Sequence, residues 1–319
     1  MIPSIGQVIC PRASTPLVNK FYVAVGSGTT NYVATSTDGI NWTPRGKPLF
    51  ANNAFSVAYN GAMWIMGGEG NSGTNLFGYS YNGIDWTGLG KSLIDYSAYD
   101  FYWNGTKWIG VGSTTVSRMN YSSNGTSWTG TGTSVFYYPG RCVTYGDGKW
   151  VAFDQRGNEN YSSNGTTWTY KATSDGISSR NDVAYNGTIW VNVGVTPNTI
   201  KYSSDGINWT GLGSTIFTSV GNQVAWNGSL WVAVGAGITN SVATSPDGIN
   251  WTGQTKGAIE IGNSIIWDGS MWILGGSGST NSIWTSTNGT TWTGRSSSVS
   301  TVTGIASTSM PNIYPPLIP

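Results

Sequence analysis

Short runs of apolar and β-branched residues alternate with polar turns along most of the chain. No segment keeps apolar residues at a 3.6-residue period for even three turns, so the pattern does not favour helices. The segment from residue 223 to residue 252 shows the alternation clearly, with Asn227-Gly228 and Asp247-Gly248 as its two tight turns. Its four β-rich runs lie at 223–226, 230–234, 241–245 and 249–252. We therefore predict four short antiparallel strands in this segment.

The same unit recurs along the chain, because two sequence signatures repeat in phase. The first signature reads Ser-x-(Asp/Asn)-Gly-x-x-Trp, and neighbouring copies lie 40 to 44 residues apart. Its tryptophans are Trp42, Trp86, Trp128, Trp168, Trp209, Trp251 and Trp292. The second signature lies between these copies and ends on Tyr22, Trp64, Trp108, Trp150, Trp190, Trp231 and Trp272. A period of about 42 residues with four strands per repeat is typical of a propeller blade.

Seven such repeats predict an all-β, seven-bladed β-propeller of four-stranded antiparallel blades. An Asn-Gly or Asp-Gly pair occupies the first turn of six repeats and the second turn of all seven. These pairs favour two-residue type I′ hairpins, in which both central residues have positive φ. We expect the turn residues of the first signature to serve the fold, because their side chains can accept hydrogen bonds from turn amides. They are Asp38, Asn82, Asn124, Asn164, Asp205, Asp247 and Asn288.

The first repeat begins at its second strand, so another segment must complete blade 1. The run Thr303-Gly304-Ile305-Ala306-Ser307 resembles the first strand of the other repeats, and we predict that it closes the ring. Gln7-Val8-Ile9-Cys10 is the alternative. We expect one domain, with tails at 1–16 and 309–319. The blades then span 17–48 plus 302–308, 49–92, 93–134, 135–174, 175–215, 216–257 and 258–298.

The composition narrows the possible partners. Charged residues make up 9% of the chain, whereas globular proteins average about 25%. Aromatic residues reach 13%, which provides a core despite the low charge. The formal net charge is +1, no cluster of Lys and Arg occurs, and no run approaches about 20 apolar residues. We therefore expect no nucleic acid partner and no membrane insertion.

The chain contains no histidine, which excludes Ser-His-Asp and Cys-His catalytic groups and histidine-ligated metals. Its two cysteines, Cys10 and Cys142, cannot form a zinc site alone, so we expect no metal and no cofactor. Both fall on candidate innermost strands, of blades 1 and 4. These strands would lie on opposite sides of the central channel, whereas a disulfide requires Cα atoms within about 7 Å. We therefore predict that the two cysteines are not bonded to each other. Residues 1–6 show no signal peptide, and we expect synthesis in the cytoplasm.

The Ser-x-Asp-Gly-x-x-Trp signature resembles the Asp box, the bacterial neuraminidase repeat of sialidases and many other propellers. The resemblance extends from about Phe21 to Trp292 and implies the architecture more than an activity. The usual Asp box has one residue between Asp and Gly, whereas Asp38-Gly39 and its counterparts here are adjacent. The turn is therefore expected to be closer to a two-residue hairpin.

The sialidase resemblance implies three arginines that clamp a carboxylate, a tyrosine nucleophile assisted by a glutamate, and an aspartic acid as acid/base. An Arg-Ile-Pro near the N-terminus would be part of this set, but the chain reads Met1-Ile2-Pro3. We therefore expect no enzyme. A glycoside hydrolase with two carboxylates on facing blades remains the alternative. Its candidates are Asp95, Asp100, Asp154 and Asp182, with Glu69 and Glu260 as the glutamates near variable loops.

Function is expected on the face opposite the tight turns. The connections from the second to the third strand and from the fourth strand to the next blade differ between repeats, and variable loops on a rigid scaffold commonly carry binding sites. They contain exposed-looking aromatic and charged residues. The candidate binding residues are Phe50, Tyr96, Phe136, Tyr137, Tyr138, Arg156, Glu159, Arg180 and Phe217.

Two binding hypotheses follow. In one, this face binds a glycan through aromatic stacking; in the other, the propeller is a rigid block that docks other proteins in an assembly. Repeats of the Ser-Asn-Gly-Thr-x-Trp-Thr style resemble those in proteins of large DNA viruses and phage tails. The resemblance implies a structural or receptor- or glycan-binding component of a virus or phage particle, so that the chain would be incorporated into a virion. The alternatives are a sialidase-like glycoside hydrolase and a lectin unrelated to any virus. The ligand and the oligomeric state stay open.

Overall fold

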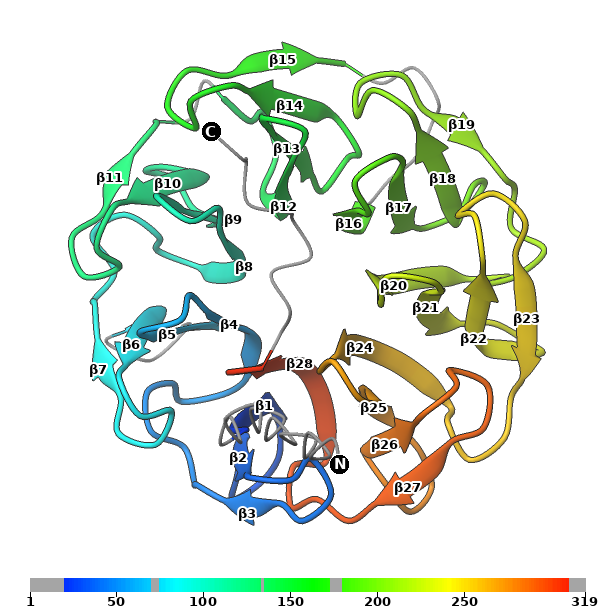
Figure 1. The fold of residues 1–319 in the computed structure, drawn as a ribbon. Helices are drawn as coiled ribbons and strands as arrows, with labels where there is room; N and C mark the ends of the chain where they lie inside the picture. The colour runs from blue at the N-terminus through cyan, green and yellow to red at the C-terminus, as the bar shows by residue number, and fades with distance from the viewer. Residues whose placement is uncertain (1–19, 70–74, 133–134, 173–179, 310–319) are drawn as a thin grey trace, which may run out of the picture.

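The structure is a computed structural model that describes residues 20–69, 75–132, 135–172 and 180–309. These residues form seven four-stranded antiparallel sheets arranged in a ring (Figure 1). The described segments contain no helix, and so none of the length and apolarity needed to cross a membrane. The prediction of a seven-bladed β-propeller is confirmed.

Each blade is a meander whose strands run in chain order from the centre outward, except in blade 1. Blade 1 has the order β28 (Thr301–Ser307), β1 (Tyr22–Ser27), β2 (Val33–Ser36) and β3 (Thr43–Pro44). Blade 2 has β4 (Ala54–Tyr59), β5 (Trp64–Gly68), β6 (Phe77–Ser80) and β7 (Thr87–Gly88). Blade 3 has β8 (Ser97–Trp103), β9 (Trp108–Ser113), β10 (Met119–Ser122) and β11 (Thr129–Gly130). Blade 4 has β12 (Gly140–Gly146), β13 (Lys149–Asp154), β14 (Glu159–Ser162) and β15 (Thr169–Lys171).

The remaining three blades repeat this order. Blade 5 has β16 (Arg180–Tyr185), β17 (Trp190–Gly194), β18 (Ile200–Ser203) and β19 (Thr210–Gly211). Blade 6 has β20 (Val220–Trp226), β21 (Trp231–Ala236), β22 (Asn240–Ser245) and β23 (Thr252–Thr255). Blade 7 has β24 (Ile261–Trp267), β25 (Trp272–Ser277), β26 (Ile283–Ser286) and β27 (Thr293–Arg295). The outermost strands are short, which limits the exposed sheet edge.

The C-terminal strand closes the ring, as predicted. Strand β28 pairs antiparallel with β1, with Ser307 opposite Tyr22, so the two ends of the described chain share blade 1 (Figure 1). Val302 and Ile305 of β28 are buried in the core between blades 7 and 1. The Tyr22 hydroxyl also donates a 2.5 Å hydrogen bond to Asp268 of blade 7, which links the two blades across this seam.

The structure tests neither the alternative ring closure by residues 7–10 nor the prediction that Cys10 and Cys142 are not bonded to each other. Residues 7–10, including Cys10, lie outside the described residues. Cys142 is buried in β12, the innermost strand of blade 4. The absence of a disulfide between the two cysteines therefore stays a prediction.

The tryptophans of the second signature form the core between neighbouring blades. Trp231 of blade 6 packs with Val193 and Ile200 of blade 5 in one buried cluster, and its side chain is fully buried. The equivalent residues are also buried, namely Tyr22, Trp64, Trp108, Trp150, Trp190 and Trp272. Large flat rings at one repeated position thus fill the wedge between adjacent twisted sheets.

The prediction of type I′ hairpins is wrong for all but one of the described turns. Among the described non-glycine residues, only Asp147 has positive φ, and Asp147-Gly148 is a two-residue turn between Gly146 and Lys149. In a typical first turn, Asn60 keeps negative φ and its Oδ1 accepts hydrogen bonds from the N–H groups of Ala62 and Met63. Because the Asn side chain satisfies the turn N–H groups, Asn itself does not need positive φ. Only the glycine that follows it adopts positive φ.

The second turns are also longer than expected, because the seven residues 36–42 separate the paired Thr35 and Thr43. Ser36 Oγ accepts hydrogen bonds from the turn N–H groups of Asp38 and Gly39. Asp38 Oδ1 accepts N–H bonds from Ile40 and Asn41. The other six copies repeat this network with Asp or Asn. Burial alone would raise the pKa of Asp38, but these hydrogen bonds outweigh it and lower the pKa to about 2.

We expect Asp205→Ala to destabilise the fold by about 1–2 kcal/mol, because it removes the acceptor of the Ile207 and Asn208 N–H bonds. Asp205→Asn is the matched control and should cost less, since Asn performs this role in four of the seven copies. Chemical denaturation of both variants at neutral pH checks the expectation. Equal stability of Asp205→Ala and the parent chain would show that the turn network is dispensable.

Candidate functional site

The meander topology separates the connections onto two faces. The hairpin turns between the first and second strands and between the third and fourth strands lie on one face, called here the tight-turn face. The remaining connections lie on the opposite face, called here the variable-loop face. Among them, the connections from one blade to the next lead into the innermost strands. The beginnings of the innermost strands therefore surround the opening of the central channel on the variable-loop face.

Three candidate binding residues are buried, which corrects the expectation that they are exposed. Phe50, Phe136 and Phe217 follow an outermost strand and insert into the core between two blades. Other blades place an apolar residue at the same point, namely Ile94, Ile259 and Val299. These residues plug the gap where one blade passes to the next, so their loops are anchored to the core.

The other candidates differ in position. Glu159 is fully buried at the start of β14, so the expectation that this residue is exposed in a loop is wrong. Tyr96 is 51% exposed in the connection that precedes β8. Arg180 begins β16, but its side chain lies outside the described part of the chain.

Three of the predicted residues meet on the variable-loop face of blade 4. The rings of Tyr137 and Tyr170 are in edge-to-face contact, with centroids 5.0 Å apart. The Arg156 guanidinium lies 4.6 Å from the centroid of the Tyr138 ring. Tyr137 is 65% exposed, whereas Tyr138 and Tyr170 are 38% and 36% exposed. We call Tyr137, Tyr138, Arg156 and Tyr170 the blade 4 cluster; sequence reasoning missed Tyr170, which lies on β15.

Buried Asp154 fixes the loop that carries Arg156. Its carboxylate accepts hydrogen bonds from the backbone N–H groups of Arg156 and Asn158 and from the Asn158 side chain, at 2.8–3.0 Å. Asp95 plays a similar role in blade 3, where it accepts hydrogen bonds from the N–H and hydroxyl groups of Thr115. Two of the four candidate catalytic aspartates therefore hold loops in place.

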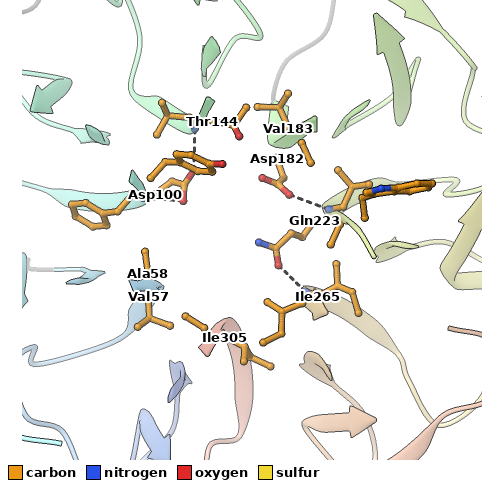
Figure 2. A pocket seen from close by; sticks show the side chains of 18 of the residues that line it. Val57, Ala58, Asp100, Thr144, Asp182, Val183, Gln223, Ile265 and Ile305 are labelled. Atoms are coloured by element: carbon orange, nitrogen blue, oxygen red, sulfur yellow. Dashed lines mark hydrogen bonds between the residues drawn. The ribbon is translucent and has the colours of Figure 1, made fainter. Parts of the chain in front are cut away.

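The other two, Asp100 and Asp182, line the central channel (Figure 2). Each side chain reaches the next inner strand: Asp100 Oδ2 accepts a 3.0 Å hydrogen bond from Val143 N–H. Asp182 Oδ2 accepts a 3.0 Å hydrogen bond from Val224 N–H. The channel enclosed by the inner strands has a cavity of about 290 Å³ at this level.

Neutral side chains make the same contact in the following blades. Gln223 Oε1 accepts a 2.6 Å hydrogen bond from Ile265 N–H, and Ser264 Oγ accepts a 3.1 Å hydrogen bond from Ile305 N–H. The repeated position thus joins four inner strands to their neighbours, and an acid is not required for this. Asp100 and Asp182 therefore have a structural role, because each links its inner strand to the next one.

Burial raises the pKa of both channel carboxyls. The pKa of Asp100 rises to about 7, although N–H bonds from Val143 and Phe101 act in the opposite direction. The pKa of Asp182 lies well above its ordinary value, first because of burial and then because of repulsion by Asp100. Both groups therefore bind protons more tightly in the folded chain than in the unfolded chain.

We expect the stability of the fold to decrease as pH rises from about 4 through 7, because ionisation of Asp100 and Asp182 is then penalised in the folded state alone. Asp182→Asn keeps an acceptor for Val224 N–H without the charge. At pH 8 this variant should be more stable than the parent, with little difference near pH 4. Asp147→Asn on the tight-turn face is the control. A pH profile of the melting temperature that is unchanged in Asp182→Asn would contradict the expectation.

A ring of seven bulged residues surrounds the channel where it opens on the variable-loop face. In each blade one residue near the start of the inner strand is skipped by the pairing with the second strand. These residues are Phe55, Tyr99, Arg141, Asn181, Asn222, Asn263 and Thr303, and all line a cavity of about 500 Å³. We call them the mouth ring.

The sequence reasoning did not single out the mouth ring, although its signal is present. The seven residues lie 40 to 44 positions apart, in phase with the tryptophans. Their side chains differ, so a search for repeated residue types passes over them. Aligning the repeats on their tryptophans would place them in one column.

The described residues show no group of three or more His, Cys, Asp or Glu side chains placed to hold a metal ion. Within the same residues, Lys20 forms an ion pair with Asp268, and Lys149 forms one with Asp147. The expectation of no metal and no cofactor continues to rest on the composition.

No protein-family model matches the chain, and no curated protein matches it significantly. Solved structures do resemble it in fold. A GH74 enzyme of Niastella koreensis superposes with a TM-score of 0.57 at 14% identity, covering 84% of this chain and 41% of that chain. YCF48 bound to D1 peptide gives a TM-score of 0.57 at 12% identity, covering 88% of this chain and 86% of that chain. A chain of a nidogen/laminin complex gives a TM-score of 0.53 at 12% identity, covering 71% and 89%.

These neighbours include an enzyme and proteins in complex with a peptide or protein partner. This chain spans less than half of the GH74 enzyme. At such low identities the likeness shows the architecture alone. The chain is thus a seven-bladed β-propeller of a shape shared by proteins with different activities.

Proposed function

We propose that the chain is a non-enzymatic binding scaffold and that a protein partner docks on the blade 4 cluster. The observation that carries this proposal is the grouping of Tyr137, Tyr138 and Tyr170 with Arg156 on the variable-loop face. Tyrosine and arginine are enriched at the energetic centres of protein interfaces, where they contribute large contact areas.

The cluster is held in place before binding, which favours docking. Asp154 fixes the Arg156 loop through three hydrogen bonds, and buried Phe136 anchors the chain just before Tyr137 and Tyr138. A partner therefore pays little conformational entropy on this side of the interface.

A glycoside hydrolase is the second candidate, because Asp100 and Asp182 line one cavity and both have raised pKa values. The contact each makes with the next inner strand also occurs with Gln223 and Ser264, which supports a structural role. We propose that purified chain shows no hydrolysis of β-glucans or sialosides. Hydrolysis that is lost in Asp100→Asn would favour the enzyme instead.

We further propose that the scaffold serves as a structural or receptor-binding component of a virus or phage particle. The support is the resemblance of its low-charge Ser-Asn-Gly-Thr-x-Trp-Thr repeats to those of large DNA virus and phage tail proteins. Mass spectrometry of purified particles from the source tests this setting. Absence of the chain from such particles would remove the setting and leave the docking proposal intact.

We expect Tyr137→Ala with Tyr138→Ala to weaken binding of the partner at least about tenfold, because two exposed rings are lost from the centre of the interface. The free energy of unfolding should change by only about 0.5 kcal/mol, since surface side chains contribute little to it. Tyr81→Ala is the matched control, because Tyr81 is 69% exposed on the tight-turn face. Equal loss of binding in the double variant and in Tyr81→Ala would contradict the proposal. Binding of a glycan instead of a protein with the same dependence would retain the site and change the partner.

A further inference from the structure

The mouth ring divides into two parts that make different contacts. In four blades the bulged side chain donates a hydrogen bond to a backbone carbonyl of the next blade, at 2.9–3.1 Å. The pairs are Asn181 with Gly221, Asn222 with Gly262, Asn263 with Val302 and Thr303 with Ala54. The ring therefore has a structural role on this side, which any small polar side chain can perform.

The other three members, Phe55, Tyr99 and Arg141, depart from this pattern. They form a continuous stack over blades 2 to 4: the rings of Phe55 and Tyr99 are 5.5 Å apart, and the Arg141 guanidinium lies 4.6 Å from the Tyr99 centroid. Large side chains at a position where small ones join the blades need a different explanation. All three are partly exposed to the cavity.

The positive charge of Arg141 has no anionic partner in the part of the chain that the structure describes. Within the described residues its guanidinium makes no hydrogen bond and no ion pair, and its Nε is buried. A buried donor left unsatisfied costs about 1–3 kcal/mol. A planar guanidinium held on an aromatic ring is suited to a carboxylate, which it can bind through two parallel N–H donors.

The rest of the cavity suits a ligand that is rich in hydroxyl groups. The wall opposite the stack presents the neutral amides of Asn222 and Asn263 and the hydroxyl of Thr303. Amides and hydroxyls both donate and accept, as sugar hydroxyls do. Aromatic faces provide a platform for the apolar C–H face of a sugar ring, and about 500 Å³ lies within the range of small-ligand sites.

We propose that the mouth ring binds a carboxylate-bearing saccharide of the uronic acid class. Its carboxylate lies on Arg141, its ring packs against Tyr99 and Phe55, and its hydroxyls face the amide side. The site is distinct from the blade 4 cluster, so either can fail without the other. Recognition of the carboxylate uses the Arg141 guanidinium, and no bond of the ligand is broken. Asp100 and Asp182 also line this cavity, and burial raises the pKa of both carboxyls, which favours their uncharged forms beside an anionic ligand.

The test compares two sugars that differ only at the recognised group. Galacturonic acid and galactose share their ring hydroxyls but have a carboxylate or a hydroxymethyl group at C5. Isothermal titration and ligand-observed NMR on the full chain should show binding of galacturonic acid or its oligomers at least about tenfold tighter than binding of galactose. Glucuronic acid and glucose form a second matched pair with a different hydroxyl arrangement.

Arg141→Gln should reduce uronate binding at least about tenfold, to the level of the neutral sugar, while Arg141→Lys should retain part of it. Arg45→Gln is the control, because Arg45 lies on the outer edge of blade 1, where its Nε donates to Thr35. Unchanged melting temperatures show that the variants fold. Equal binding of the acidic and neutral sugars, uronate binding unaffected by Arg141→Gln, or no binding of any uronate would overturn the proposal. Arg141-dependent binding of a peptide carboxylate in place of both uronates would overturn the saccharide assignment.

Discussion

A chain that ends at Arg295 should fail to fold cooperatively. It keeps β27 but loses β28, the innermost strand of blade 1. The loss exposes the pairing edge of β1 and removes the buried side chains of Val299, Val302 and Ile305. Each such side chain contributes about 1.5–3 kcal/mol by burial, and the total approaches the 5–15 kcal/mol stability of a typical protein. Differential scanning calorimetry and light scattering should show no cooperative melt and aggregation.

A chain that ends at Ser309 is the control, because it retains β28 whole. It should melt as the full-length protein does. If the chain ending at Arg295 also gave a cooperative melt at the full-length temperature, ring closure by β28 would be wrong. Residues 7–10 would then be the segment to test for closure.

Trp231→Ala should lower the free energy of unfolding by about 3–5 kcal/mol, the range measured for truncating large buried rings. Trp231 is fully buried between blades 5 and 6, where it contacts residues of both. The cavity left behind cannot close without moving two rigid sheets toward each other. Urea denaturation gives the change directly.

Trp231→Phe provides an intermediate case, since a smaller ring fills part of the space. Tyr81→Ala, an exposed ring on the tight-turn face, should cost about 0.5 kcal/mol or less. A loss for Trp231→Ala as small as that for Tyr81→Ala would mean that the inter-blade tryptophans do not hold the ring together.

The blade architecture could be predicted because its determinants are local and repeated. Each hairpin is encoded within a few residues, as at Asn227-Gly228, and the tryptophan period gives the number of blades. Ring closure by 303–307 could also be predicted, because that segment resembles the inner strands of other repeats. The conformation of the turns could not: the side chain of Asn60 or Asp38 satisfies the turn amides, so only glycine needs positive φ.

The candidate site was predicted only in part, because loop position alone does not determine exposure. Tyr137, Tyr138 and Arg156 come together as a cluster, whereas Phe136 beside them is buried in the gap between two blades. An aromatic residue in a connection can face solvent or insert into the core, and two adjacent aromatic residues can differ completely in exposure. Tyr137 lies in the connection before β12, and the ring that it contacts belongs to Tyr170 on β15.

The tight-turn face and the variable-loop face of the propeller differ in how regular they are. The tight-turn face repeats one hydrogen-bond network seven times, and its side chains satisfy backbone groups. The variable-loop face carries the blade 4 cluster and the channel opening, where the repeats depart from one another. We therefore propose that binding takes place on the variable-loop face, while the tight-turn face maintains the scaffold.

Photo-crosslinking from opposite faces tests this central claim most directly. Benzoylphenylalanine placed at position 137 or at position 81 replaces a tyrosine of similar exposure, 65% and 69% respectively. Each full-length variant is expressed in the native source and irradiated, and adducts are identified by mass spectrometry. The account predicts a specific protein adduct from position 137 and none from position 81. A specific adduct from position 81 alone, or no adduct from either position, would contradict it.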